Sequence, residues 1–147
     1  MPKVYTPPQM NWSRRSLAFL LPAMAAGQSR TKKEPLASGA FRFEEMEARK
    51  SGAITLRQIL KGDTHTGLLV DLHESELPAG QTPHAPHHHL HEEMLLVREG
   101  TMEVTIAGKV TRLGPGSVAY IASNQEHGYR NPGSTPVSYF VLALGTD

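Results

Sequence analysis

A chain of 147 residues, 39% of them apolar, is long enough for one domain with a modest core. Its 13 glycines and 11 prolines predict frequent turns, and the absence of cysteine excludes a disulfide scaffold, a zinc ribbon and a thiol nucleophile. The formal net charge of +1 predicts no general attraction to nucleic acid or to anionic membranes.

The beginning of the chain has the parts of an export signal in the expected order. Arg14 and Arg15 precede a short apolar stretch at residues 17–26, and the small residues Ala23–Ala25 fit a signal-peptidase site. The paired arginines also resemble a twin-arginine signal. Pro22 interrupts the apolar stretch, which is too short to span a bilayer.

These features predict that residues 1–37 are a leader, made of an export signal and a polar linker. We therefore expect a periplasmic or secreted protein with no stable membrane anchor after processing. The alternatives are an N-terminal arm that packs on the body or on a second copy, and a cytoplasmic location.

The remaining residues, 38–147, are expected to form one all-β domain. Residues 41–50 are interpreted as a short strand followed by a helical turn, which Gly52 ends. Beyond Gly52, β-rich runs alternate with turn residues. We expect these runs at residues 53–62, 66–77, 93–100, 101–108, 109–116, 117–123 and 136–145. In the run 101–108, apolar Met102, Val104 and Ile106 alternate with polar residues, which is the period of a strand with one buried face.

The stretch PHAPHHHLHEEMLLVREG, residues 83–100, holds five of the eight histidines. In an extended chain His87 and His89 share a face, while His88 points to the other side. Glu93 begins an apolar run, and a carboxylate that projects from it into a barrel needs a cation or a hydrogen-bond donor. His127 is the only histidine downstream, so we expect a fourth ligand there.

Alternation along the strand also sorts the neighbours of these residues. His91 has the same parity as Glu93, so it is expected to support the ligands or to contact a substrate. His84, His88 and Glu92 are expected to face solvent. Two side chains that flank His127, Glu126 and Tyr129, either reach the mouth of the barrel or lie on the surface. The upstream His65 and His73 are interpreted as isolated.

A purification tag and a surface metal trap both fit the histidine run less well than a defined site does. A tag is terminal and uninterrupted, whereas this run is internal and broken by Leu90. A surface trap without a defined site leaves the spacing to Glu93 as coincidence.

The stretch resembles the first motif of the cupin family, a His-x-His pair, three or four residues, a Glu, six residues and a Gly. Here His87 and His89 are followed by three residues, then Glu93, then six residues and Gly100. The resemblance covers about residues 65–147.

The second cupin motif is a Gly, five residues, Pro-x-Gly, two residues, a His, three residues and an Asn. The same spacing is found from Gly116 through Ala122-x-Asn124 and His127 to Asn131. Ala122 and Asn124 replace the usual Pro and Gly, so a different turn is expected before His127. Asn124 can still adopt a positive φ, as Gly would.

The resemblance implies a single cupin barrel, that is, a double-stranded β-helix or jelly roll, with one metal ion in its mouth. It implies that the ligands are His87, His89, Glu93 and His127. It also implies a homodimer, because dimers are common in the family. Three imidazoles and a carboxylate suit one divalent transition metal, Mn, Fe, Ni, Cu or Zn, and the lack of thiolate argues against a purely structural zinc site. Four protein ligands leave coordination positions open for substrate, water or dioxygen.

Three functions are compatible with such a barrel and ligand set. The first is a metal-dependent oxygenase, isomerase or lyase that acts on a small organic molecule. The second is a non-catalytic cupin that binds a small ligand or sugar, and the third is a metal-holding or structural role. An ionisable group beside the open coordination positions would favour the enzyme, and the candidates are His91, Glu126 and Tyr129.

Overall fold

The structure is a computed structural model in which residues 34–146 are described. All the described residues belong to one compact unit, Lys32–Asp147. The predicted export signal therefore lies outside the described residues. The described elements are η1 (Phe43–Glu45), β1 (Ala48–Ser51), β2 (Ile54–Asp63), β3 (Leu69–Leu77), β4 (Glu92–Glu99), β5 (Met102–Ile106), β6 (Lys109–Leu113), β7 (Val118–Ile121), β8 (His127–Arg130) and β9 (Val137–Leu144).

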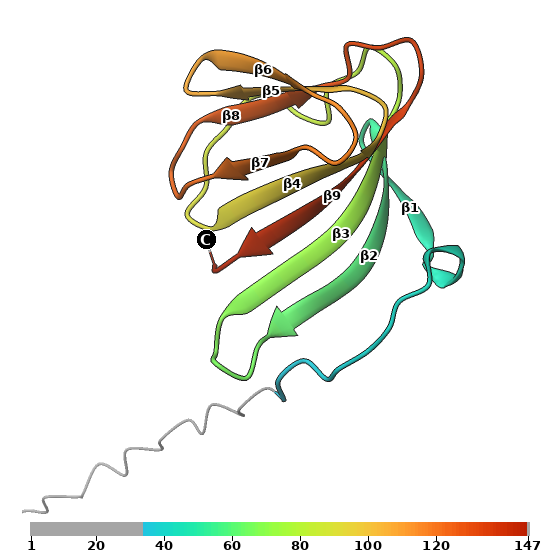
Figure 1. Ribbon diagram of the computed structural model, residues 1–147. Coiled ribbons are helices and arrows are strands. Elements are labelled where there is room, and N and C mark those ends of the chain that lie inside the picture. The colour runs from blue at the N-terminus through green and yellow to red at the C-terminus, as the bar shows by residue number, and fades with distance from the viewer. Residues whose placement is uncertain (1–33, 147) are drawn as a thin grey trace, which may run out of the picture. The chain divides into compact units, whose positions relative to one another are not determined.

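These strands form two antiparallel sheets, as Figure 1 shows. One sheet has six strands in the order β1-β2-β3-β9-β4-β7, and the other has three in the order β6-β5-β8. The long strands β3 and β4 both pair with β9, the last strand, so the end of the chain closes the middle of the large sheet. The predicted all-β barrel is confirmed. No helix among the described residues is long and apolar enough to cross a membrane.

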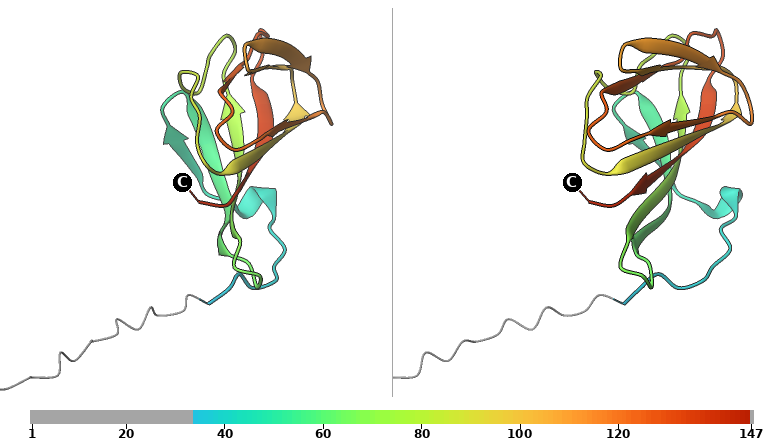
Figure 2. Two further views of the ribbon diagram at one scale, coloured as in Figure 1. Left: turned by 90° about the vertical axis from the view of Figure 1, so that its left-hand side faces the viewer. Right: turned by 60° about the vertical axis from the view of Figure 1, so that its left-hand side comes forward.

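The core lies between the two sheets, which face each other in the rotated views of Figure 2. Leu95 and Val97 enter it from β4, and Met102 and Val104 enter it from β5, each at most 1% exposed. The alternation predicted for residues 101–108 is confirmed at Met102 and Val104. Because every second residue of β4 points into this core, Glu93 is brought to the same side as Leu95 and Val97.

The prediction for residues 41–50 had its two elements in the wrong order. A 3-10 turn at Phe43–Glu45 comes first, and the strand Ala48–Ser51 follows it and pairs with β2. The Phe43 ring lies 4.7 Å from the Arg57 guanidinium and 4.5 Å from that of Arg98. The turn is therefore held by contacts with β2 and β4 that a local pattern does not reveal. Before it, the Leu36 amide donates to the Asp63 carbonyl at 2.8 Å.

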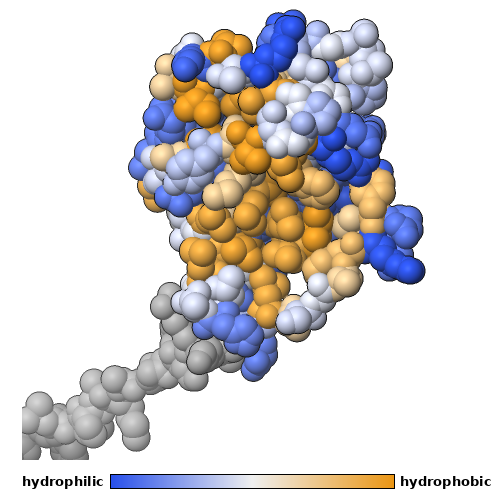
Figure 3. All heavy atoms as spheres, viewed as in Figure 1, coloured by the Kyte–Doolittle hydropathy of each residue, from blue (hydrophilic) through white to orange (hydrophobic). Residues whose placement is uncertain are grey.

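The outer face of the large sheet is apolar. Figure 3 shows apolar side chains gathered over this face. They line a shallow groove of about 360 Å³, formed by Leu72, Met94, Leu96, Val118, Phe140 and Leu142. These residues alternate with the inward-facing ones, so the groove and the barrel interior lie on opposite faces of the same strands.

Two glycines of the predicted motifs turn the chain with a positive φ. Gly100 has φ +81°, and a side chain there would approach the Pro136 carbonyl oxygen to 2.9 Å. Gly116 has φ +80°, but no atom lies within 4 Å of the position that a Cβ would take. Both positions disfavour an L side chain through φ, and Gly100 is also closed by the neighbouring backbone.

We expect Gly100→Ala to destabilise the protein more than Gly116→Ala. Gly116→Ala is the matched control. It should lower the free energy of unfolding by about 1–2 kcal/mol, the usual cost of a left-handed conformation for a residue with a Cβ. Gly100→Ala adds the clash with the backbone at Pro136 and Val137. Urea unfolding of both variants measures the difference, and equal losses would show that the strand end moves aside at no cost.

Candidate metal centre

Backbone hydrogen bonds hold residues 87–91, here called the histidine loop, against β8. The amides of His87 and His127 each donate to the carbonyl of the other, at 3.0 and 2.9 Å. The Asn124 amide donates to the His89 carbonyl at 2.8 Å, from a turn in which Asn124 has φ +60°. Asn124 thus adopts the positive φ that the sequence allowed for it. The two sequence motifs, far apart in the chain, are thus joined by main-chain contacts.

Two of the imidazoles have their tautomers set by backbone carbonyls. His89 Nδ1 lies 2.8 Å from the His91 carbonyl oxygen, and His127 Nδ1 lies 2.9 Å from that of Gln125. A carbonyl oxygen only accepts, so each Nδ1 carries the proton and each Nε2 presents a lone pair. Such a carbonyl partner is the usual companion of a metal-binding histidine.

The lone pairs converge on one place. Among the described residues, His89 Nε2, His127 Nε2 and His87 Nδ1 are buried and have no hydrogen-bond partner. One ligand atom from each of these three histidines lies within 4.8 Å of the others. Buried polar atoms are nearly always paired, so three buried imidazole nitrogens without a hydrogen-bond partner in one cluster are suited to hold a cation. The residues present therefore fit a metal ion.

The predicted fourth ligand lies beside this trio. Glu93 is 8% exposed, and its Oε2 lies 3.5 Å from His89 Nε2 and 3.9 Å from His91 Nε2. His89, His91 and Glu93 form a second group of possible ligands within 4.8 Å of one another. His89 belongs to both groups, and the His91 ring stacks on it at 3.5 Å. The role of Glu93 as a ligand stays a prediction.

The other carboxylate oxygen of Glu93 is held by a tyrosine. The Tyr129 hydroxyl donates a hydrogen bond to Glu93 Oε1. Burial, and then the neighbouring Glu93 carboxylate, raise the pKa of Tyr129 well above its usual range. The phenol therefore stays protonated and acts as a donor. Tyr129 is 5% exposed, so the surface position considered for it is wrong, and it belongs to the site.

A pocket of about 170 Å³ opens next to Glu93. Its lining brings together strands β2, β3, β4, β8 and β9 with the chain before the histidine loop: Ile54, His73, Ser75, Pro83, His84, Glu93, Tyr129, Tyr139 and Val141. His73, interpreted as isolated from the sequence, lies in this lining. The missed signal was the alternation of β3, which places Asp71, His73 and Ser75 on the side that faces the core.

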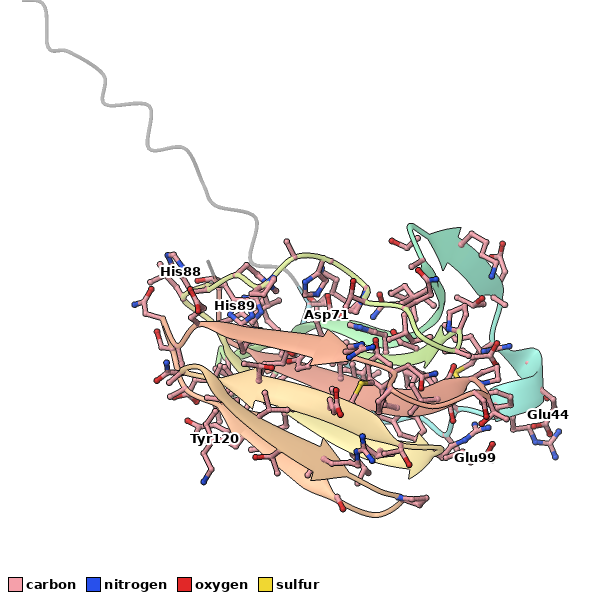
Figure 4. The ribbon with its side chains drawn as sticks, turned by 90° about the horizontal axis from the view of Figure 1, so that it is seen from above. Glu44, Asp71, His88, His89, Glu99 and Tyr120 are labelled. Carbon is pink, nitrogen blue, oxygen red and sulfur yellow. The ribbon has the colours of Figure 1, made fainter. Side chains whose placement is uncertain are left out.

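The other residues singled out from the sequence agree with their expected positions to different degrees. His88 is exposed while His87 and His89 are half-buried, as the parity of the loop predicted, and Figure 4 shows His88 at the rim with His89 further in. His84 is exposed as expected, but its ring lies 4.3 Å from that of His87. Glu126 is exposed. His91, expected to support the ligands, does lie beside Glu93.

The His87 imidazole is disfavoured as a cation. Partial burial, followed by the neighbouring His84, His127 and His89 side chains, lowers its pKa. A lowered pKa leaves the imidazole neutral near pH 7, which is the form that binds metal.

Residues 73–143 match the Cupin domain family, which includes both predicted motifs. With the fold described above, this match shows that residues 73–143 form a domain of the cupin superfamily. No curated protein matches the sequence.

Solved structures of cupin fold are similar over most of their length. KdgF from Halomonas sp. has a TM-score of 0.64 at 18% identity, over 76% of this chain and 97% of its own. The polyketide cyclase RemF from Streptomyces resistomycificus has 0.62 at 21% identity, over 75% and 81%. A predicted oxalate decarboxylase from Thermotoga maritima has 0.64 at 17% identity, over 74% and 100%. The TM-scores establish the fold, whereas identities this low leave the reaction open.

We expect Tyr129→Phe to lower the free energy of unfolding of the metal-free protein by about 1–3 kcal/mol, because it removes the donor to the buried Glu93 carboxylate. Tyr120→Phe is the control, since Tyr120 is 50% exposed, and it should change stability by no more than about 0.5 kcal/mol. Urea unfolding of both variants measures the difference. Equal stability of the two variants would show that Glu93 does not depend on the phenol.

Proposed function

We propose that this cupin is a metal-dependent enzyme that acts on a small organic molecule, as an oxygenase, isomerase or lyase. The observation that carries the proposal is the set of three buried, unpaired imidazole nitrogens beside a pocket lined by ionisable groups. A pocket of about 170 Å³ suits a small substrate, because it is smaller than the usual range for drug-sized ligands.

We propose His87, His89, Glu93 and His127 as the protein ligands of one divalent transition metal. Neutral imidazoles and one carboxylate suit Mn, Fe, Ni, Cu or Zn. When bound, such an ion supplies a Lewis acid with open positions for substrate. The protein contributes the tautomers of His89 and His127 and the Tyr129 hydrogen bond to Glu93.

Elemental analysis of protein purified without added metal, followed by oxygen consumption with diketones, phenols and thiols, tests this function. A redox-active metal with turnover of one class supports the oxygenase. Turnover without oxygen consumption supports the isomerase or lyase. A bound metal with no turnover of any class leaves the alternative, a cupin that binds a small ligand or sugar without chemistry.

We further propose that the protein is exported and then periplasmic or secreted. The support is the order of Arg14 and Arg15, the apolar stretch 17–26 and the small residues Ala23–Ala25. The boundary between a leader of residues 1–37 and a domain of residues 38–147 stays a prediction. So does the homodimer, which rests on the family resemblance alone.

Alanine substitution of any proposed ligand, His87, His89, Glu93 or His127, should reduce bound metal at least about tenfold. Each removes one coordinating atom, and even the partners of ligands often change affinity by about 10–100-fold. His88→Ala is the matched control, because His88 is exposed and points away from the cluster. Metal content per chain, measured by mass spectrometry, checks the prediction.

His91→Ala decides between the two overlapping groups. If His87, His89 and His127 hold the ion with Glu93, His91→Ala retains most of the metal. If the ion sits between His89, His91 and Glu93, His91→Ala loses it and His127→Ala does not. Equal metal loss in His88→Ala would show that the register of the loop is wrong by one residue.

The stability that metal adds should disappear in acid. Metal at 100 times its dissociation constant stabilises the fold by about 2.7 kcal/mol. Binding needs neutral imidazoles, which titrate near about pH 6.5 when unperturbed. The lowered pKa of His87 also makes the protein less stable in acid. The folded protein then binds fewer protons than the unfolded chain, so the free energy of unfolding falls as pH falls.

Thermal melts of the metal-loaded and metal-free protein between about pH 7.5 and 5 span this titration. The gap between the two melting temperatures should be largest at the neutral end and should close towards pH 5. A gap that stays constant through this range would contradict histidine ligation.

A further inference from the structure

The inner face of β3 places an imidazole that is not a candidate ligand, that of His73, beside the proposed metal centre. His73 lines the same pocket as Glu93 and Tyr129, and its side chain is 20% exposed. It is not a member of either group of possible metal ligands. Because His73 lies at the pocket wall next to Glu93, its function depends on the partner of its ring and on which ring nitrogen is free to meet a ligand.

Asp71, two residues earlier on the same face, is a fixed carboxylate behind His73. Lys61 Nζ lies 2.6 Å from Asp71 Oδ2, and Gln58 Nε2 donates to Oδ1 at 2.8 Å. Partial burial raises the pKa of Asp71, but the hydrogen bonds from Lys61 and Gln58 outweigh it and keep the pKa below its usual value. The carboxylate is therefore ionised and held from two sides.

The Asp71 carboxylate favours one tautomer of the His73 ring. Its Nδ1 lies 3.7 Å from Asp71 Oδ1, which is too long for a direct hydrogen bond but close enough for an electrostatic preference. A proton on Nδ1 is stabilised beside the negative charge, so the neutral ring carries its proton there and keeps a lone pair on Nε2. Burial lowers the pKa of His73 and outweighs the opposing effects of Asp71 and Glu93, so the neutral form is favoured.

The other polar groups of the pocket are less suited to accept a proton. The Tyr129 hydroxyl donates to Glu93, and burial raises the pKa of Tyr139 above its usual range, so both stay protonated. His84 is exposed, and its Nδ1 lies 3.0 Å from a backbone carbonyl, that of Ala85. His73 is the imidazole of this lining with a carboxylate on its Nδ1 side.

We propose that His73 Nε2 accepts a proton from a hydroxyl group of the small molecule bound in this pocket, with Asp71 as the residue that positions the ring. This inference rests on the proposed metal-dependent function and assigns its missing base. The O–H bond of the ligand breaks, an N–H bond forms on Nε2, and the electron pair stays on the ligand oxygen. The imidazolium that results is stabilised by Asp71, and no oxidant or reductant is needed. The site thus selects ligands that present an ionisable hydroxyl, such as an enol, a hydroxy acid or a catechol.

The first test uses the wild-type protein without metal. Nitrogen-15 NMR of the imidazoles reports which ring nitrogen carries the proton. We expect His73 to be protonated on Nδ1 and unprotonated on Nε2, and we expect Asp71→Asn to weaken this preference. A wild-type His73 that carries its proton on Nε2 would overturn the inference, and this measurement does not depend on a variant that folds or on metal uptake.

The second test uses the protein loaded with zinc, which is redox-inert, and 4-nitrocatechol as the probe, because its visible absorbance changes on ionisation. We expect His73→Gln to retain the zinc content of the wild type but to bind the probe at least tenfold more weakly. His65→Gln is the matched control, since His65 is exposed in the turn between β2 and β3, and it should bind as the wild type does. Asp71→Asn should fall between them.

The outcomes separate the inference from the function on which it rests. Zinc uptake with equal probe affinity in the wild type and His73→Gln overturns the role of His73 and leaves the metal centre intact. Zinc uptake without binding of 4-nitrocatechol to the wild type likewise overturns the inferred ligand class. A wild type that takes up no zinc or other divalent transition metal overturns the metal centre and the inference together.

Discussion

The buried carboxylate of Glu93 is the constraint around which the interior of this barrel is organised. β4 turns Glu93 to the same side as Leu95 and Val97, so the charge lies at the edge of an apolar core. An isolated charge in such a place is costly, and it persists where donors or a cation compensate it. Tyr129 from β8 provides the donor, and the imidazoles of the histidine loop lie on the other side. The strand that builds the core therefore also requires the polar site.

The main chain contributes as much to this site as the side chains do. The bridge between His87 and His127 fixes the loop to β8, and the carbonyls of His91 and Gln125 decide which nitrogen of His89 and His127 carries the proton. A ligand whose tautomer is already set loses little freedom when a metal binds. The short spacings within each motif thus have a direct physical meaning, because they place one residue's carbonyl at the ring of another.

Local patterns were sufficient for what lies along one strand or one loop. Alternation predicted which of His87, His88 and His89 is exposed, and the spacing of Asn124 allowed its positive φ to be anticipated. The same patterns were insufficient for contacts that strand pairing creates. His73 lies on β3 next to β9, and it lines the same pocket as Glu93 because the sheet has the order β3-β9-β4. The sequence separation between His73 and Glu93 does not indicate that the two residues are neighbours. The order of the 3-10 turn at Phe43 and the strand after it was predicted wrongly for the same reason, because contacts with other strands determine it.

This division explains why the family is easier to identify than the reaction. The cupin motifs contain the proposed metal-binding histidines and the turns that position them, and structures of this fold include one named as a cyclase and one named as a predicted oxalate decarboxylase. The wall of the pocket is different, because β3 and β9 supply it with His73, Ser75 and Tyr139, which belong to neither motif. A metal that polarises a substrate is shared by many chemistries, whereas the group that takes its proton distinguishes one from another. Under the proposed function, the choice of reaction therefore depends on residues that become neighbours only when the sheet has formed, and the pair of Asp71 and His73 is our candidate for that role.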